Sequence, residues 1–177
     1  GLIGMKTRNH YTMADWLPQN CWLLKDVSAL IGGDYTKQVT RTISHKQFFS
    51  NKGITDTSHI IPDRIITLDY IPLDFFQNVL DQLKTGDILA LLSSNLNNIF
   101  SAHMVMVAET EEGIIIRESS NSKMKTFDTI IKEWINQKIN IKPQRYLGIV
   151  VMRVKEEINN PGKLIYPSKI RNLKKIK

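Results

Sequence analysis

The sequence predicts an α+β domain, with short helices in its first half and an antiparallel sheet in its second half. Two kinds of observation predict it: the apolar runs of the second half have the length of strands, and two of them are joined by a hairpin signal. The chain has 177 residues, 42% hydrophobic and 23% charged. Such a chain can bury a core as one domain.

The early elements are short. Pro18 limits any helix near the start, because proline cannot continue a helix interior. A turn is expected at residues 32–33, which are both glycine. Residues 39–44 alternate between larger and hydroxyl side chains, which predicts a half-buried strand. Ser44 followed by Gln47 is typical of a capping box, so a short helix should begin there.

The middle of the chain predicts a strand followed by a helix. Residues 64–70 are typical of a strand, which Pro72 should stop because proline cannot donate to a sheet ladder. Residues 73–87 then show helical spacing, with Gly86 where a C-terminal cap belongs. The residues expected on the buried face of this helix are Phe75, Val79 and Leu83.

The late elements complete the predicted sheet. A loop with the sequence TEEG indicates that the second and third late strands form a hairpin. Thr126 is a plausible cap for a helix over residues 128–137. The late strands are expected at residues 87–92, 103–109, 113–119 and 146–154.

The net charge of +7 is concentrated at the end of the chain. Residues 163–177 carry six basic side chains and no acidic one, so no basic face is expected on the body. We therefore divide the chain into a folded part, residues 1–157, and a basic tail, residues 158–177. Such a tail can attract nucleic acid, anionic lipid or a wall polymer, but it is more often simply solvated. We expect no nucleic-acid partner and no membrane span, since no apolar run approaches the roughly 20 residues needed.

The chain has one cysteine, Cys21, which rules out an internal disulfide. No paired Cys or Cys/His spacing predicts a zinc site, and no cofactor is expected. The sequence begins at Gly1 without an initiator Met and without the layout of a signal peptide. We expect Gly1 to be an interior cut, with any targeting segment upstream.

The most informative feature lies around His103. The stretch TGDILALL is followed by an irregular loop and then by His103 at the head of an apolar strand. A histidine at the mouth of a rigid strand can hold its ring within reach of a nucleophile, which suits a general base. Taken alone, such a histidine is more often structural.

The pattern around His103 resembles the second half of the NlpC-type papain-like superfamily, whose members hydrolyse peptidoglycan peptides. The pattern is GD, strand, loop, H-x-x-x-V, hairpin, strand and a serine pair. A second set of motifs resembles the N-acetylmuramoyl-L-alanine amidase-like branch of this superfamily over about residues 1–155. These motifs are RNHYTMADWLPQN, KDVSALIGG, DYIP, TGDILAL, AHMVMV and IVVMRV. The resemblance implies the sheet half of a papain-like (NlpC-type) fold with short flanking helices.

The resemblance also implies roles for particular residues. His103 would be the base that pairs with a catalytic cysteine. Five residues are carried over as cleft residues that bind substrate: Arg8, His10, Tyr11, Asp15 and Trp16. Each also has a plainer interpretation, since Arg8 and Asp15 could form a surface pair, and Tyr11 and Trp16 could be core residues.

The sequence departs from the superfamily in two places. The Asp-Cys-Thr-like motif that supplies the nucleophile is missing, and we expect Cys21 to be a small packing residue. The cysteine-bearing helices are therefore expected upstream of Gly1. The second departure concerns the group that orients the base, where Arg117 stands and cannot accept a hydrogen bond. Two residues are candidates for this role: Glu118, if a bulge turned it to the cleft, and Ser119.

The resemblance implies a cysteine amidase that cleaves the N-acetylmuramoyl-L-alanine bond of muropeptides, with Arg8 pairing with a substrate carboxylate. The alternatives left open are an endopeptidase between D-Glu and the diamino acid, an acyltransferase on the same scaffold, and a wall-binding module without activity. Wall chemistry implies either export, to the periplasm or cell envelope, or recycling of wall fragments. The oligomeric state cannot be predicted from the sequence.

Overall fold

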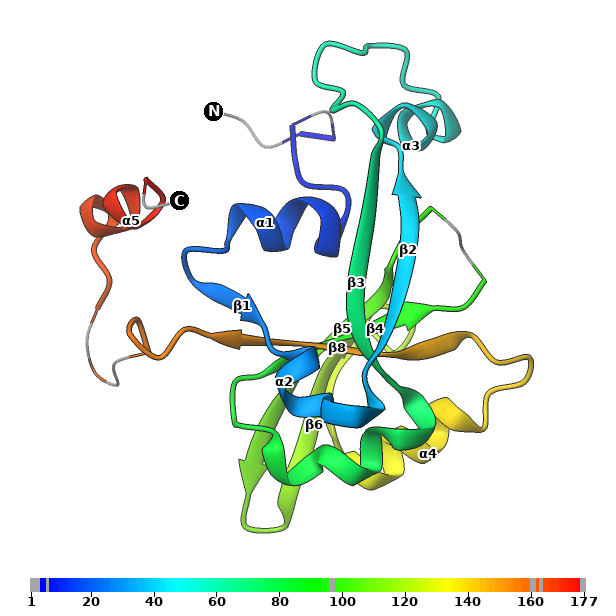
Figure 1. Cartoon of the computed structure of the whole chain (residues 1–177), viewed down its shortest axis with the longest axis vertical. Coiled ribbons are helices and arrows are strands. Elements are labelled where there is room, and N and C mark those ends of the chain that lie inside the picture. The colour runs from blue at the N-terminus through cyan, green and yellow to red at the C-terminus, as the bar shows by residue number, and fades with distance from the viewer. Residues whose placement is uncertain (1–3, 6, 96–97, 160–161, 163, 176–177) are drawn as a thin grey trace.

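A computed structural model describes residues 4–5, 7–95, 98–159, 162 and 164–175 of the chain (Figure 1). Its centre is an antiparallel sheet of eight strands in the order β2-β3-β8-β4-β5-β6-β7, with β1 paired to β8. The predicted α+β class is therefore confirmed. The strands are β1 (Leu24–Asp26), β2 (Lys37–Ile43), β3 (Arg64–Pro72), β4 (Ile88–Ser93), β5 (Ser101–Thr110), β6 (Gly113–Ser120), β7 (Lys125–Ile130) and β8 (Tyr146–Val154).

The helices in the described part of the chain are short. Several consist of a single turn, and α4 and η3 are longer. The helices are η1 (Thr12–Trp16, a π-helix), α1 (Leu17–Gln19), α2 (Ser28–Gly32), η2 (Gly33–Tyr35), α3 (His45–Asn51), η3 (Leu73–Gln82, a 3₁₀ helix), α4 (Ile131–Ile139) and α5 (Pro167–Leu173).

Several predicted elements occur where the sequence placed them. The hairpin joins β5 to β6 with Thr110 opposite Gly113. The Ser44 hydroxyl accepts a hydrogen bond from the Gln47 backbone N–H at 3.2 Å and so caps α3. The strands expected at residues 39–44, 64–70 and 146–154 correspond to β2, β3 and β8.

The helix expected after Pro72 differs from the prediction. It is a 3₁₀ helix that ends at Gln82 and buries every third residue, Leu73, Phe76 and Val79. Phe75, predicted as a core residue, is 40% exposed and stacks on Tyr35, because a repeat of three residues turns it outward. Gly86 is not a cap: it has φ +91° in the turn before β4 and donates its N–H to the Val107 carbonyl at 2.9 Å.

The helix predicted over residues 128–137 begins later, at Ile131. The residues before it form β7, an edge strand paired with β6, so Thr126 lies opposite Ser119 and caps nothing. Pairing with β6 satisfies the backbone of residues 125–130, and this outweighs their helical pattern. The remaining helix, α4, buries Ile131, Trp134 and Ile135 at the spacing of one helical face.

The two faces of the sheet carry separate hydrophobic clusters. Helices α2, η3 and α4 pack on one face, which we call the helical face; its sheet residues include Leu91, Val105, Val107, Ile116 and Ile149. The N-terminal segment packs on the other face, which we call the N-terminal face; residues of that cluster include Tyr11, Met13, Ala90, Leu92 and Val150.

Strands β2 and β3 form an arm that extends from the sheet and carries α3 near its tip (Figure 1). The arm joins the sheet where Ile71 and Pro72 of β3 pair with Ile149 and Gly148 of β8. A Cβ atom on Gly148 would lie 2.2 Å from the Ile71 carbonyl oxygen, so only glycine allows this close approach.

Helix α5 lies in the stretch predicted as a basic tail and is set apart from the sheet (Figure 1). Next to its end, the Lys174 ammonium lies 5.8 Å from the centre of the Trp22 ring. No helix among the described residues is both long enough and apolar enough to cross a bilayer.

Candidate functional site

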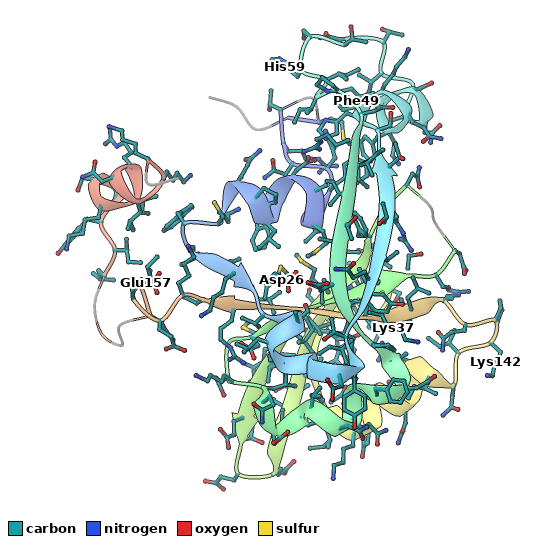
Figure 2. The ribbon with its side chains drawn as sticks, viewed as in Figure 1. Asp26, Lys37, Phe49, His59, Lys142 and Glu157 are labelled. Carbon is teal, nitrogen blue, oxygen red and sulfur yellow. The ribbon has the colours of Figure 1, made fainter. Side chains whose placement is uncertain are left out.

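The N-terminal segment and the tip of the arm enclose a polar pocket of about 200 Å³, which we call the histidine pocket. Three of the predicted cleft residues, Arg8, His10 and Asp15, line it together. Two histidines that the sequence analysis did not single out, His45 and His59, line it as well. Figure 2 shows His59 at the same end of the molecule as Phe49 of α3. The remaining lining residues are Thr7, Asn9, Gln19 and Ile61.

Asp15 is the buried residue that holds the lining of the histidine pocket together. It is 3% exposed, and its carboxylate accepts hydrogen bonds from Arg64 Nη2 at 2.5 Å and from His45 Nε2 at 2.9 Å. The backbone N–H groups of His10 and Tyr11 donate to the same carboxylate at 3.3 and 3.1 Å. Burial opposes the charge, yet the Arg64 hydrogen bond and the nearby His45 hold the pKa of Asp15 below its ordinary value. Asp15 therefore stays ionised and fixes the N-terminal segment to α3 and β3.

His45 is the first residue of α3 and is 4% exposed. Because the Asp15 carboxylate can only accept, the Nε2 atom of His45 carries the proton between them. The Nδ1 atom is buried and has no hydrogen-bond partner in the described part of the chain. One ring nitrogen of His45 is thus hydrogen-bonded to a carboxylate, and the other has no hydrogen bond among the described residues.

His10 is half-buried against aromatic rings, with its ring centre 4.4 Å from that of Phe48 and 5.7 Å from that of His45. Its ring nitrogens are buried, and a backbone hydrogen-bond interaction with Met5 favours the protonated ring. Burial, together with the charges of His45 and Arg8, lowers the pKa of His10 from its ordinary value, against a smaller opposing effect of the Asp15 carboxylate. These surroundings therefore favour the neutral ring.

The other predicted cleft residues have different surroundings. Arg8 is exposed, and its Nη2 atom lies 3.2 Å from the Met5 sulfur, so it is not paired with Asp15. Tyr11 is buried and donates its hydroxyl to the Ser44 carbonyl at 3.0 Å. Trp16 packs against the same cluster as Tyr11. These two rings shape the segment that carries the histidine pocket, and they do not line it.

His103 lies near the start of β5 in the middle of the sheet. It is half-buried and pairs with Leu91 of β4. Directly opposed residues share a face, so the His103 side chain projects from the helical face, in line with Val105 and Val107. Two buried neighbours on the same strand, Val105 and Val107, therefore fix the backbone that carries the ring.

Glu118 projects from the same face as His103 without any bulge. Its strand neighbour Ile116 pairs with Val107, and both belong to the cluster on the helical face. The expectation that only a bulge could turn Glu118 to this face is therefore wrong, because the regular alternation of β6 does so. The Glu118 side chain is 10% exposed; its Oε2 accepts from Trp134 Nε1 at 2.8 Å and lies 3.8 Å from Lys138 Nζ.

The neighbours of Glu118 face the other way. Arg117 makes two hydrogen bonds of 2.8 Å to the carboxylate of Asp128 on β7. Ser119 is exposed and lies on the same face as Arg117. Of the two tentative orienting groups, Glu118 is thus the one on the face of His103.

The structure brings the predicted residues together as two groups. Ser101, two residues before His103, shares a hollow of about 160 Å³ with His10 and Tyr11. The loop before His103 therefore packs beside the N-terminal segment. The His103 ring, however, projects from the opposite face of the sheet and lines neither this hollow nor the histidine pocket.

A larger groove of about 1,250 Å³ runs along β2, the edge strand of the arm. Its lining is rich in hydroxyl and amide groups, including those of Thr40, Gln47, Asn51 and Asn98. Lys46, next to His45 in the chain, lines this groove and not the histidine pocket. The sequence analysis missed this groove, because it forms between segments distant in the chain.

Cys21 is exposed in the turn after α1, so the expectation that it is a packing residue is wrong. Among the described residues, no group of three or more His, Cys, Asp or Glu side chains is placed to hold a metal ion.

An antiparallel sheet with a histidine and a carboxylate on one face, and a polar pocket beside its N-terminal segment, defines an α+β protein with two candidate sites. The chain belongs to the AmiA-like family, described as N-acetylmuramoyl-L-alanine amidase-like, whose model matches residues 1–141. The family places the chain among amidase-like proteins. No curated protein matches it.

Solved structures show the same fold at low sequence identity. A Legionella pneumophila protein matches with a TM-score of 0.71 and 16% identity, covering 86% of this chain and 64% of that one. An N-acetylmuramoyl-L-alanine amidase from Bacteroides uniformis matches with a TM-score of 0.63 and 19% identity, covering 88% and 68%. A putative xylanase from Bacteroides fragilis matches with a TM-score of 0.59 and 20% identity, covering 86% and 69%. The chain thus spans less than two thirds of the length of the Legionella protein.

Proposed function

We propose that this chain supplies the histidine half of a cysteine amidase that cleaves the N-acetylmuramoyl-L-alanine bond of cell-wall muropeptides. The observation that carries the proposal is the placement of His103 near the start of a central strand, with Glu118 on the same face of the sheet. Membership of the amidase-like family supports the choice of an amide as the reacting bond.

The reaction would run in two balanced steps. A cysteine thiolate attacks the amide carbonyl, a C–S bond forms, and His103 donates its proton to the leaving amine as the C–N bond breaks. Water then attacks the thioester, His103 takes a proton from that water, and the thiolate is released. The products are the muramoyl carboxylate and a peptide with a free L-alanine amine.

Glu118 is proposed to position His103. A carboxylate beside an imidazole can accept a hydrogen bond from a ring N–H and so fix the tautomer that the reaction needs. The hydrogen bond from Trp134 and the ion pair with Lys138 both go to Oε2 of Glu118, which holds the side chain in place. Ser119, on the opposite face, is the weaker candidate for this role.

The nucleophilic cysteine is proposed to lie outside these 177 residues, in a papain-like (NlpC-type) domain of which this sheet is one part. Cys21 is exposed in a turn and not at the start of a helix, where a thiolate would be stabilised. A wall substrate also leads us to propose that the protein is exported to the cell envelope.

The test uses the complete protein and purified muropeptides. His103→Ala should lower the release of peptides that begin with L-alanine by about 10³-fold, the usual scale of a lost general acid–base group. Met104→Ala is the matched control, since it truncates the neighbouring side chain, which is 37% exposed on the other face. Hydrolysis retained in His103→Ala would sink the proposal. Mass analysis that shows cleavage after D-Glu would instead assign an endopeptidase.

A further inference from the structure

The excess positive charge of the chain lies in its last residues, outside the sheet. Of the chain's 24 basic and 17 acidic side chains, residues 163–177 carry six basic and no acidic ones, which leaves 18 basic and 17 acidic for residues 1–162. Like charges that lie close together repel one another, and an anionic surface relieves that repulsion. A partner for this stretch should therefore be anionic.

The same stretch also exposes apolar groups to water. Leu164 is 79% exposed and Tyr166 is 60% exposed, while Ile170 and Leu173 of α5 are half-buried. Tyr166, Ile170 and Leu173 follow one another at spacings of four and three residues, which places them on one side of the helix. We call these three residues the apolar stripe. A partner that contacted only the charges would leave this apolar surface in water.

Basic side chains border the apolar stripe. Lys169 follows Tyr166 by three residues and precedes Leu173 by four, and Lys174 follows Ile170 by four, so both lysines are helix neighbours of the stripe. A lysine in such a position can lay its methylene stem along an apolar surface and keep its ammonium group among polar groups. An apolar stripe bordered by bases is typical of helices that lie in the plane of a bilayer surface.

Helix α5 is placed where a flat surface can reach it. Figure 1 shows it at one side of the molecule, set apart from the sheet. From Tyr166 to Lys175, every residue except Ile170 and Leu173 is exposed. The Lys174 ammonium lies 5.8 Å from the centre of the Trp22 ring, but the lysine is itself exposed, so lipid phosphates can also reach its charge.

We propose that residues 164–175 form a docking surface for an anionic phospholipid bilayer. The apolar stripe enters the boundary between headgroups and acyl chains, and the basic side chains pair with the lipid phosphates. Nucleic acid or an anionic polymer would use the charges but not the stripe, and for this reason a bilayer is favoured. The surface contains neither His103 nor a residue that lines the histidine pocket, so lipid binding does not depend on the proposed amidase function.

Co-sedimentation of the complete protein with vesicles tests this docking. The vesicles contain phosphatidylglycerol and phosphatidylcholine in equal parts, or phosphatidylcholine alone. The protein should bind the anionic vesicles about tenfold or more tightly, and this preference should shrink between about 50 mM and about 500 mM NaCl, because salt screens the charges. Equal binding to both kinds of vesicle at low salt would overturn the proposal, as would a preference retained after deletion of residues 163–177.

A matched pair of variants tests the charges of the docking surface. Lys169→Gln together with Lys174→Gln should weaken binding to the anionic vesicles about tenfold or more, since each lysine near the surface adds to the attraction. Lys52→Gln together with Lys132→Gln removes two exposed lysines outside this surface and should bind like the parent. Equal losses in the two double variants would show that net charge acts without α5 and would overturn the proposal.

A second pair of substitutions tests the apolar contribution. Leu164→Ser together with Tyr166→Ser keeps every charge and should weaken binding to the anionic vesicles about tenfold, while any binding to duplex DNA stays unchanged. Vesicle binding that survives this pair of substitutions would overturn the proposal in favour of a polymer recognised by charge alone. None of these measurements requires hydrolysis, so a failed amidase assignment would not be mistaken for a failed docking surface.

Discussion

His45 and His103 are held in their places by different means. His45 is 4% exposed and its ring is fixed by side chains, through the buried carboxylate of Asp15 and the guanidinium of Arg64 behind it. His103 is half-buried, and its position is set by the backbone of β5, which pairs there with Leu91 of β4. His45 thus depends on two other side chains for its orientation, whereas the strand that carries His103 sets the backbone geometry of its ring without them.

The largest effect is expected from removing the carboxylate of Asp15, which bonds both His45 and Arg64. Asp15→Ala leaves Arg64 and His45 without their shared partner, and we expect unfolding to become easier by about 3 kcal/mol, as for other buried ion pairs. Urea denaturation measures the change. The control is Asp128→Ala, whose exposed pair with Arg117 should contribute far less, because solvent screens it. Equal effects of the two variants would show that Asp15 is no anchor.

The second prediction concerns the positioning of His103. Glu118→Gln keeps the shape of the side chain but removes its charge, and the rate of amide hydrolysis should fall by about 10- to 100-fold. If the role is positioning, the loss should fall on kcat, with KM within a few-fold of the parent. Ser119→Ala serves as the control on the opposite face. A Glu118→Gln enzyme with the parent rate would remove Glu118 from the mechanism.

The histidine pocket should also make stability depend on pH. The folded state lowers the pKa of His10 from its ordinary value of 6.5, so the unfolded chain binds more protons below that pH. The stability contributed is therefore present above about pH 6.5 and is lost as the pH falls; Asp15, with its own pKa lowered from 3.8, adds to the loss below about pH 4. Between about pH 6.5 and about pH 4, the Tm of thermal unfolding should fall as the pH falls, and His10→Gln should make this dependence weaker. A slope unchanged in His10→Gln would contradict this account.

The smallest expected effect is at Cys21. Because it is exposed in a turn, Cys21→Ser should change stability by less than about 0.5 kcal/mol and leave hydrolysis by the complete protein unaltered. Loss of activity would make Cys21 the nucleophile and would overturn the proposal that the cysteine lies elsewhere.

Much of the sheet could be predicted because strand length, alternation and a hairpin loop are local signals. The hairpin of β5 and β6 and the Ser44 cap are examples, since each depends on residues close in the chain. Strand β7 could not be predicted, because its residues gain their pairing from β6 and have a helical pattern of their own. The 3₁₀ repeat that turns Phe75 outward was hidden for a similar reason, since packing on the sheet decides it.

The candidate site was predicted in part. The clustering of Arg8, His10 and Asp15 followed from one short motif. His45, His59 and Arg64 come from segments 30 or more residues away, and only folding brings them to Asp15 or its pocket. One signal was available: an acidic residue in an apolar, aromatic stretch needs a basic partner if it is buried. It could not show which of the many basic residues would supply it.

The most direct test of this account compares His103→Gln with His45→Gln in the complete protein, with kcat and KM for muropeptide hydrolysis measured separately. We predict that His103→Gln lowers kcat by about 10³-fold, because the proton donor is lost. We predict that His45→Gln leaves kcat within a few-fold of the parent, because the His45 ring lies in the histidine pocket, away from the face of the sheet that carries His103. The reverse result, with kcat lost in His45→Gln and retained in His103→Gln, would contradict the account and move the catalytic histidine to the Asp15 pocket.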